Sequence, residues 1–219
     1  MYTQVPLEVT QTLKKLGSVF AFPATAVLLL WVGIIPVQYN PIILGIVFCT
    51  IGLGVRRAVI TNTWSLVEIG FHWKNITKGL PYYSMLIFIG ALCFAYAHKF
   101  VPVRESIVSS EGVSWKFLVS VLICTGMQQF LFSAYLIKKM KDIFSPHRWW
   151  IVCGIVVIFF TGAHIFFSNP EVVLPATFVF SAVVTPLYYF QPNYLFAWMT
   201  HSIFNAFVIY VKVFTPIWA

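Results

Sequence analysis

Long apolar segments separated by short polar ones follow each other along almost the whole chain. Each approaches the roughly 20 residues that a helix needs to cross a membrane, except the second, which is shorter. The segments are continuous rather than alternating, so they predict membrane helices and not strands. We expect seven spans, at residues 16–37, 41–55, 80–97, 117–137, 149–167, 172–190 and 194–217.

The composition supports this interpretation. Of the 219 residues, 60% are hydrophobic and only 9% are charged, whereas soluble domains carry about 25% charged residues. We therefore predict an all-α, polytopic integral membrane protein whose residues 1–219 form a single membrane domain.

The basic residues lie in the short segments beside the predicted spans, and they predict an orientation. With a cytoplasmic N-terminus, ten of the 14 basic residues face the cytoplasm and four lie outside, as the positive-inside rule requires. We expect a protein of the bacterial inner-membrane type. The net charge of +8 then indicates anionic lipid rather than nucleic acid, because no basic run interleaved with aromatic residues lies outside the spans.

Metal and disulfide chemistry receive no support from the cysteines. The four cysteines lie inside apolar segments and form no Cys-x-x-Cys pair, so we expect neither disulfides nor a zinc site; they are Cys49, Cys93, Cys124 and Cys153. Two histidines with only amides near them are a poor zinc ligand set. We expect no cofactor, although an imidazole could ligate a porphyrin.

Polar residues inside three predicted spans are the candidates for function. Such residues usually face the interior of a helix bundle, and residues four apart share one helix face. The fourth, fifth and seventh spans each carry one pair with that spacing. We therefore predict one central site; its residues are Gln128, Gln129, Ser133, Phe160, His164, His201 and Asn205.

This single site meets one geometric difficulty. Counting along the spans places His164 nearer the outer membrane surface and His201 nearer the inner one. Kinks or tilts, for instance at Pro175 and Pro186 in the sixth span, would have to bring the two histidines level. A simpler alternative for Gln128 and Gln129 is packing, since interhelical amide hydrogen bonds stabilise membrane bundles by about 0.6–2 kcal/mol.

Two motifs carry a resemblance to a known family. Phe-x-x-x-His is present as Phe160 and His164, and His-x-x-x-Asn is present as His201 and Asn205. An Asn-Pro turn follows the first motif, and Pro-Asn-Tyr-Leu-Phe precedes the second. Over about residues 112–210 the chain resembles the CAAX-protease and bacteriocin-processing (CPBP, or Abi) family of intramembrane proteases. The resemblance implies that family's helical core.

The family's first motif, Glu-Glu-x-x-x-Arg, is changed in this chain. Gln128 and Gln129 match the two glutamates, and Ser133 matches the arginine. The resemblance implies that glutamate and histidine activate a water for peptide hydrolysis, with Asn205 available as an oxyanion donor. An amide cannot serve as that general base. Loss of the acids alone would strand an arginine at a cost of about 2.5–3.5 kcal/mol, so the joint loss indicates a coherent neutral site.

Other acids would have to come from outside the spans. The six carboxylates lie in the polar segments: Glu8, Glu68, Glu105, Glu111, Asp142 and Glu171. Glu68 and Glu171 lie near enough to span ends for an inward-folding loop to bring them to the site.

Three functions follow from these observations. We expect a non-proteolytic protein, a pseudoprotease, that binds another membrane protein or a peptide and acts as an assembly or regulatory subunit. The first alternative is an active intramembrane endopeptidase that uses His164 or His201 as the base, with Gln128 positioning water. The second alternative is a cofactor-binding subunit of a membrane complex.

Overall fold

The computed structural model describes residues 40–97, 108–109, 112–113, 115–165 and 170–210, together with residues 11 and 14. The predicted first span, residues 16–37, lies outside the described residues. Apart from the turns that connect the helices, the described chain is helical except for one small antiparallel pair, β1 (Val108–Ser109) with β2 (Gly112–Val113). The helical class predicted from the apolar segments is therefore confirmed for this part of the chain.

The elements follow the order of the predicted spans. They are α2 (Asn40–Ile60), α3 (Trp73–Ala97), α4 (Trp115–Gln129), a π-helix η2 (Phe130–Ile137), α5 (Lys138–Ile143), a 3₁₀ turn η3 (Pro146–Arg148), α6 (Trp149–Gly162), α7 (Pro170–Phe190) and α8 (Tyr194–Tyr210).

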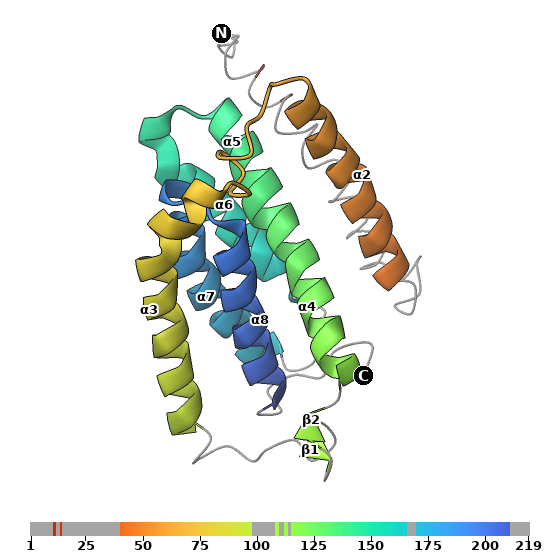
Figure 1. Cartoon of the computed structure of the whole chain (residues 1–219), viewed down its shortest axis with the longest axis vertical. Helices are drawn as coiled ribbons and strands as arrows, with labels where there is room; N and C mark the ends of the chain where they lie inside the picture. Colours follow the sequence, from red (N-terminus) through yellow and green to blue (C-terminus); the bar gives the residue numbers. More distant parts are fainter. Residues whose placement is uncertain are drawn as a thin grey trace, which may run out of the picture.

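The helices form a bundle in which α8 is central. Helices α3 and α4 both pack on α8, and α6 packs on α7. Figure 1 shows α3, α8 and α4 across the front of the bundle, α6 and α7 behind them, and α2 at the edge beyond α4. A buried cluster that includes Tyr83, Met140, Val156, Tyr188 and Ala197 joins five of these helices.

Two described helices are long and apolar enough to cross a membrane, Leu118–Ile143 and Val173–Phe190, and Pro146–Gly162 is apolar but shorter. These helices agree with a membrane protein by their length and composition. The predicted number of seven spans remains a prediction.

Charged residues end the predicted spans without ending the helices. Helix α2 continues through Arg56 and Arg57 to Ile60, although the predicted second span ends at residue 55. The fourth span continues as helix past Lys138 to Ile143. Lysine and arginine are good helix formers, so a charge marks where an apolar segment ends and not where the helix ends.

The segment between α2 and α3 folds back over the ends of α7 and α8. The hydroxyl of Tyr188 donates to the Ile69 carbonyl at 2.7 Å, and the Tyr194 amide donates to the Gly70 carbonyl at 3.0 Å. Gly70 has a φ of 76°, which favours glycine. A Cβ there would also lie 2.7 Å from the Tyr188 hydroxyl oxygen. Residues 61–72 thus form a turn segment between α2 and α3 that lies against the end of α7 and the start of α8.

Asn193 connects the start of α3 to the start of α8 by hydrogen bonds, and this role gives a first prediction. The fully buried side chain donates to the Asn75 carbonyl at 2.7 Å and accepts from the Phe196 amide at the start of α8. Asn193→Ala removes the cap of α8 and the hydrogen bond to the Asn75 carbonyl, so we expect a loss of about 1–3 kcal/mol of stability. Thermal unfolding in detergent measures it, with the exposed Thr77→Ala as control. An unchanged melting temperature would contradict the assigned role.

Candidate functional site

The ring of Phe160, near the end of α6, is the centre of the candidate site. Its side chain is 3% exposed. The His164 ring centroid lies 4.9 Å from the Phe160 centroid, and the His201 centroid lies 5.2 Å from it. The structure therefore brings the predicted Phe-x-x-x-His and His-x-x-x-Asn motifs together on one aromatic ring.

His164 lies in the turn that follows α6, not inside the helix as the sequence predicted. Helix α6 ends at Gly162, and the His164 amide then donates to the Thr161 carbonyl at 2.9 Å. The buried imidazole places Nδ1 2.7 Å from the Phe160 carbonyl oxygen. A carbonyl only accepts, so Nδ1 is the protonated nitrogen and Nε2 carries the lone pair. The early helix end directs the imidazole back over Phe160.

His201 lies on α8 and is almost fully buried. Its ring packs on Phe180 of α7 at 5.2 Å as well as on Phe160. Asn205, one turn further along α8, supplies a hydrogen-bond partner to the His201 side chain. The Nδ1 atom of His201 has no hydrogen-bond partner within the described part of the chain.

The expected difference in depth between the histidines is bridged by aromatic packing. Phe160 contacts both imidazoles, and Phe180 contacts Phe160 at 6.0 Å as well as His201. Pro175 and Pro186, the expected kink sites, lie inside α7, which remains one helix through both. Nothing in the sequence indicated that Phe160 and Phe180 link the two histidines, because both side chains are apolar like their neighbours. The motif spacing had, however, already selected Phe160 as a site residue.

Gln129 is the more deeply placed of the two glutamines. Its side chain is 2% exposed, and its Oε1 accepts a hydrogen bond from the Ser133 hydroxyl at 2.5 Å. The predicted shared face of these two residues is thereby confirmed. Gln129 and Ser133 thus form a buried neutral pair. They stand at the positions where the family motif has a glutamate and an arginine of opposite charge.

Gln128 is half-buried and differs from its neighbour. Its Oε1 is buried and has no hydrogen-bond partner among the described residues. The contact from this helix to the imidazoles runs through Phe132, whose ring lies 5.2 Å from that of Phe160 in an edge-on arrangement. Phe132 therefore links the helix that carries the glutamines to the ring that supports both histidines.

A π-helix begins directly after the glutamines. Residues Phe130–Ile137 adopt it, and Ser133, Ala134, Leu136 and Ile137 are buried within it. Such segments are rare and often lie at functional sites. The apolar sequence of this segment gives no signal that separates a π-helix from an α-helix, and the sequence prediction missed it.

The acids whose side chains are described are engaged elsewhere. Lys138 binds Glu68 at 3.4 Å and also pairs with Asp142. Both carboxylates line a cleft near the α7–α8 turn, formed with residues such as Gln191 and Pro192. The idea that Glu68 folds into the histidine site is therefore wrong. The side chains of Glu8, Glu105, Glu111 and Glu171 lie outside the described residues.

Metal binding gains no support from the part of the chain that the structure describes. Those residues contain no group of three or more histidine, cysteine, aspartate or glutamate side chains that could hold a metal ion. His164 and His201 are accompanied by aromatic rings and by the amide of Asn205. This set resembles a hydrogen-bonding pocket more than a metal centre.

Ser133 gives a second prediction. Ser133→Ala leaves the buried Gln129 acceptor without this donor, and we expect a loss of about 1–3 kcal/mol of stability. Thermal unfolding measures the change, and Ser133→Thr, which keeps the hydroxyl, is the matched comparison. Equal losses in both variants would show that crowding, not the hydrogen bond, decides the effect.

Comparison with known proteins assigns the segment that carries these residues. Residues 110–207 match the family model described as "Type II CAAX prenyl endopeptidase Rce1-like". Comparisons with curated proteins and with solved structures gave no significant match. The matched segment contains both histidine motifs and the altered glutamine motif. The part of the chain that builds the candidate site, residues 110–207, is therefore similar to the type II CAAX prenyl endopeptidases that this Rce1-like family model describes.

Proposed function

We propose that this protein is a non-proteolytic, CAAX-protease-like membrane protein that binds a membrane protein or peptide and acts as an assembly or regulatory subunit. The observation that carries the proposal is the neutral pair of Gln129 and Ser133. Its hydrogen bond occupies the positions where the family motif has an acid and an arginine. The site keeps both imidazoles but holds amides where the resemblance implies a carboxylate.

The chemistry of an amide supports this proposal. Hydrolysis of a peptide bond needs a group that takes a proton from the attacking water. The side chains of Gln128 and Gln129 can orient a water, but an amide does not accept its proton. The carboxylates of Glu68 and Asp142 are paired with Lys138 at the cleft near the α7–α8 turn.

The candidate site retains polar atoms with which a bound peptide segment can form hydrogen bonds. The Oε1 atom of Gln128 and Nδ1 of His201 are buried polar atoms without partners among the described residues. An unpaired buried polar atom costs about 1–3 kcal/mol, so a bound segment that supplies its own backbone N–H and C=O groups would gain that free energy. Asn205, beside His201, adds an amide to the same region.

A second candidate function has one observation in its favour. Because Nδ1 of His164 donates to the Phe160 carbonyl, the lone pair of His164 lies on Nε2. Such an imidazole has the tautomer of a general base. An endopeptidase that uses His164 as base and Gln128 to position water is therefore the alternative to the binding protein.

The orientation of the chain is part of the proposal. Lys78, Lys138 and Lys141 line one cleft, and the distribution of basic residues assigns all three to the cytoplasmic side. This common location supports a cytoplasmic N-terminus and the bacterial inner-membrane type.

Isolation from the native membrane in mild detergent tests the binding function. We expect the tagged chain to co-purify with one membrane protein or peptide in constant ratio. The double variant Gln128→Ala with His201→Ala should lose that partner, because it removes both unpaired polar atoms. His147→Ala changes an exposed histidine and should keep the partner. A chain that is always solitary, or a partner indifferent to the double variant, would contradict the proposal.

A further inference from the structure

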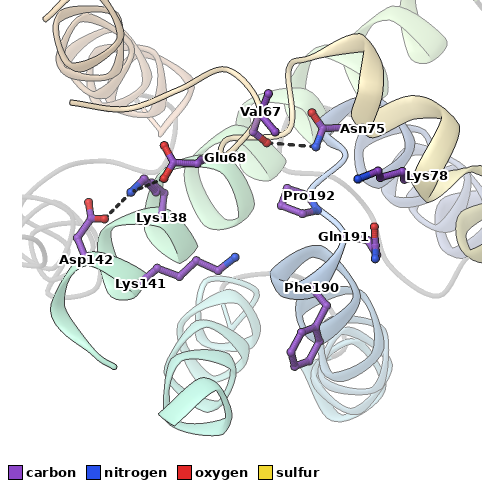
Figure 2. Close-up of a pocket in the computed structure, with 10 residues that line it drawn as sticks. All are labelled: Val67, Glu68, Asn75, Lys78, Lys138, Lys141, Asp142, Phe190, Gln191 and Pro192. Atoms are coloured by element: carbon purple, nitrogen blue, oxygen red, sulfur yellow. Dashed lines mark hydrogen bonds and ion pairs between the residues drawn. The ribbon is translucent and has the colours of Figure 1, made fainter. Parts of the chain in front are cut away.

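A cleft of about 550 Å³ lies at the end of the bundle that contains the α7–α8 turn. Its walls come from the segment before α3, from α3 itself, from α5 and from the end of α7 (Figure 2). The residues that carry the argument are Glu68, Asn75, Lys78, Lys138, Lys141 and Asp142.

The cleft lies where two membrane-compatible helices end. The helix Leu118–Ile143 and the helix Val173–Phe190 have their C-terminal ends here, and Lys141 and Phe190 both line the cleft. The end of a spanning helix lies at the level of the lipid headgroups. The cleft therefore opens at the depth at which the phosphates of the membrane lie.

The two carboxylates of the cleft already have partners. Glu68 accepts from the Ser65 amide and hydroxyl with one oxygen, and its other oxygen binds Lys138 at 3.4 Å. Asp142 pairs with Lys138 and accepts from the Trp64 indole at 3.0 Å. The Ser65 hydrogen bonds hold the pKa of Glu68 below its usual value, so this group is ionised at neutral pH. Lys138 therefore forms an ion pair with each of these two carboxylates.

The other two lysines retain donors. The ammonium of Lys141 donates to the Tyr189 carbonyl and lies 4.1 Å from the centre of the Tyr189 ring, which leaves part of its three-donor capacity. Lys78 is exposed on α3. Figure 2 shows these two side chains extending toward each other from opposite sides of the cleft. A cleft whose two carboxylates are engaged and whose ammonium groups are available selects an anion.

Asn75 adds a buried acceptor to the cleft. Its side chain is only 8% exposed; Nδ2 donates to the Val67 carbonyl at 3.1 Å, while Oδ1 has no partner among the described residues. A hydroxyl group can donate to this oxygen. The combination of two ammonium groups and one buried acceptor suits a phosphate that carries a hydroxylated substituent.

We propose that this cleft is a binding site for the phosphate headgroup of an anionic membrane lipid, held by Lys78 and Lys141, with a headgroup hydroxyl donating to Asn75. A phosphate offers acceptor oxygens to both lysines at once. The volume of the cleft accommodates a whole headgroup, and its depth places it beside the lipid phosphates. The site lies apart from the aromatic–imidazole cluster, so the inference is independent of the proposed function.

Lipid retention by the intact protein tests this inference. The full chain is reconstituted in nanodiscs of phosphatidylcholine with a minor fraction of phosphatidylglycerol, released into detergent, and weighed by native mass spectrometry. We expect phosphatidylglycerol to remain bound in preference to phosphatidylcholine by about tenfold, the factor that 1.4 kcal/mol gives. Lys78→Gln combined with Lys141→Gln should abolish that preference. Lys74→Gln, which changes another exposed lysine of α3 outside the cleft, should leave it intact.

The remaining comparisons decide both the source of the phosphate and the site itself. Lys78→Gln alone preserves the contact between Lys141 and Tyr189, so a reduced preference in this folded variant supports the site even where the double variant unfolds. Thermal stabilisation by inorganic phosphate equal to that by the lipid would overturn the lipid as the source. Equal retention of both lipids, or a preference that survives Lys78→Gln and the double variant, would overturn the site.

Discussion

Restoring the charged motif should create peptidase activity. In the triple variant Gln128→Glu, Gln129→Glu and Ser133→Arg, we expect cleavage of a prenylated CAAX peptide to rise about 10²–10⁴-fold above that of the unmodified chain, the range that a positioned general base contributes. Gln129 and Ser133 are already in hydrogen-bond contact. The new carboxylate and guanidinium at these positions are therefore placed to form an ion pair. A fluorogenic peptide assay in lipid measures the rate.

The controls of this experiment separate chemistry from folding. Gln128→Glu with Gln129→Glu, without the change at Ser133, leaves two buried carboxylates without the arginine and should be less stable than the triple variant by several kcal/mol. Adding His164→Ala to the triple variant should remove the new activity and preserve the fold. A correctly folded triple variant that gains no cleavage would contradict the idea that the missing acid is what prevents catalysis.

Phe160→Ala should produce the largest loss of stability in the site. The ring is buried against Phe132, Phe180 and both imidazoles, and truncation of a core phenylalanine typically costs about 3–5 kcal/mol. We also expect the bound partner to be lost, because the two histidines then lack their common support. Thermal unfolding and co-purification measure the two effects.

Two comparisons make the Phe160 experiment specific. Phe178→Ala truncates an exposed ring of α7, and we expect a change in stability within about 0.5 kcal/mol. Phe160→Leu retains most of the apolar volume, so it should retain most of the stability while weakening partner binding. A Phe160→Ala protein that unfolds at the wild-type temperature would show that the ring does not hold the cluster together.

The sequence predicted the members of the site better than its geometry. The four-residue spacing placed His164 with Phe160 and Gln129 with Ser133, and both pairs are in contact. The spacing works because helix neighbours and the first turn beyond a helix end lie on one side. The position of His164 depends on the turn that begins at Ala163, after the end of α6, and apolar periodicity does not encode this turn.

Helix ends and local helix type were the least predictable features. Lys138 and Arg56 mark the ends of apolar segments, yet the backbone hydrogen bonds continue past them. The π-helix at Phe130–Ile137 depends on how neighbouring helices pack around it, and its residues resemble those of any buried helix. The pairing of Glu68 with Lys138, 70 positions away in the sequence, was not predicted either. Such long-range pairing has no local signal.

The peptidase rate of the unmodified chain, compared with that of His164→Ala in the same lipid, tests the central claim most directly. If the protein is non-proteolytic, as proposed, the amides of Gln128 and Gln129 do not take the proton of the attacking water. Both proteins should then cleave the prenylated peptide no faster than an empty-membrane control. Cleavage by the unmodified chain that disappears in a folded His164→Ala variant would contradict the account and establish the imidazole as the base.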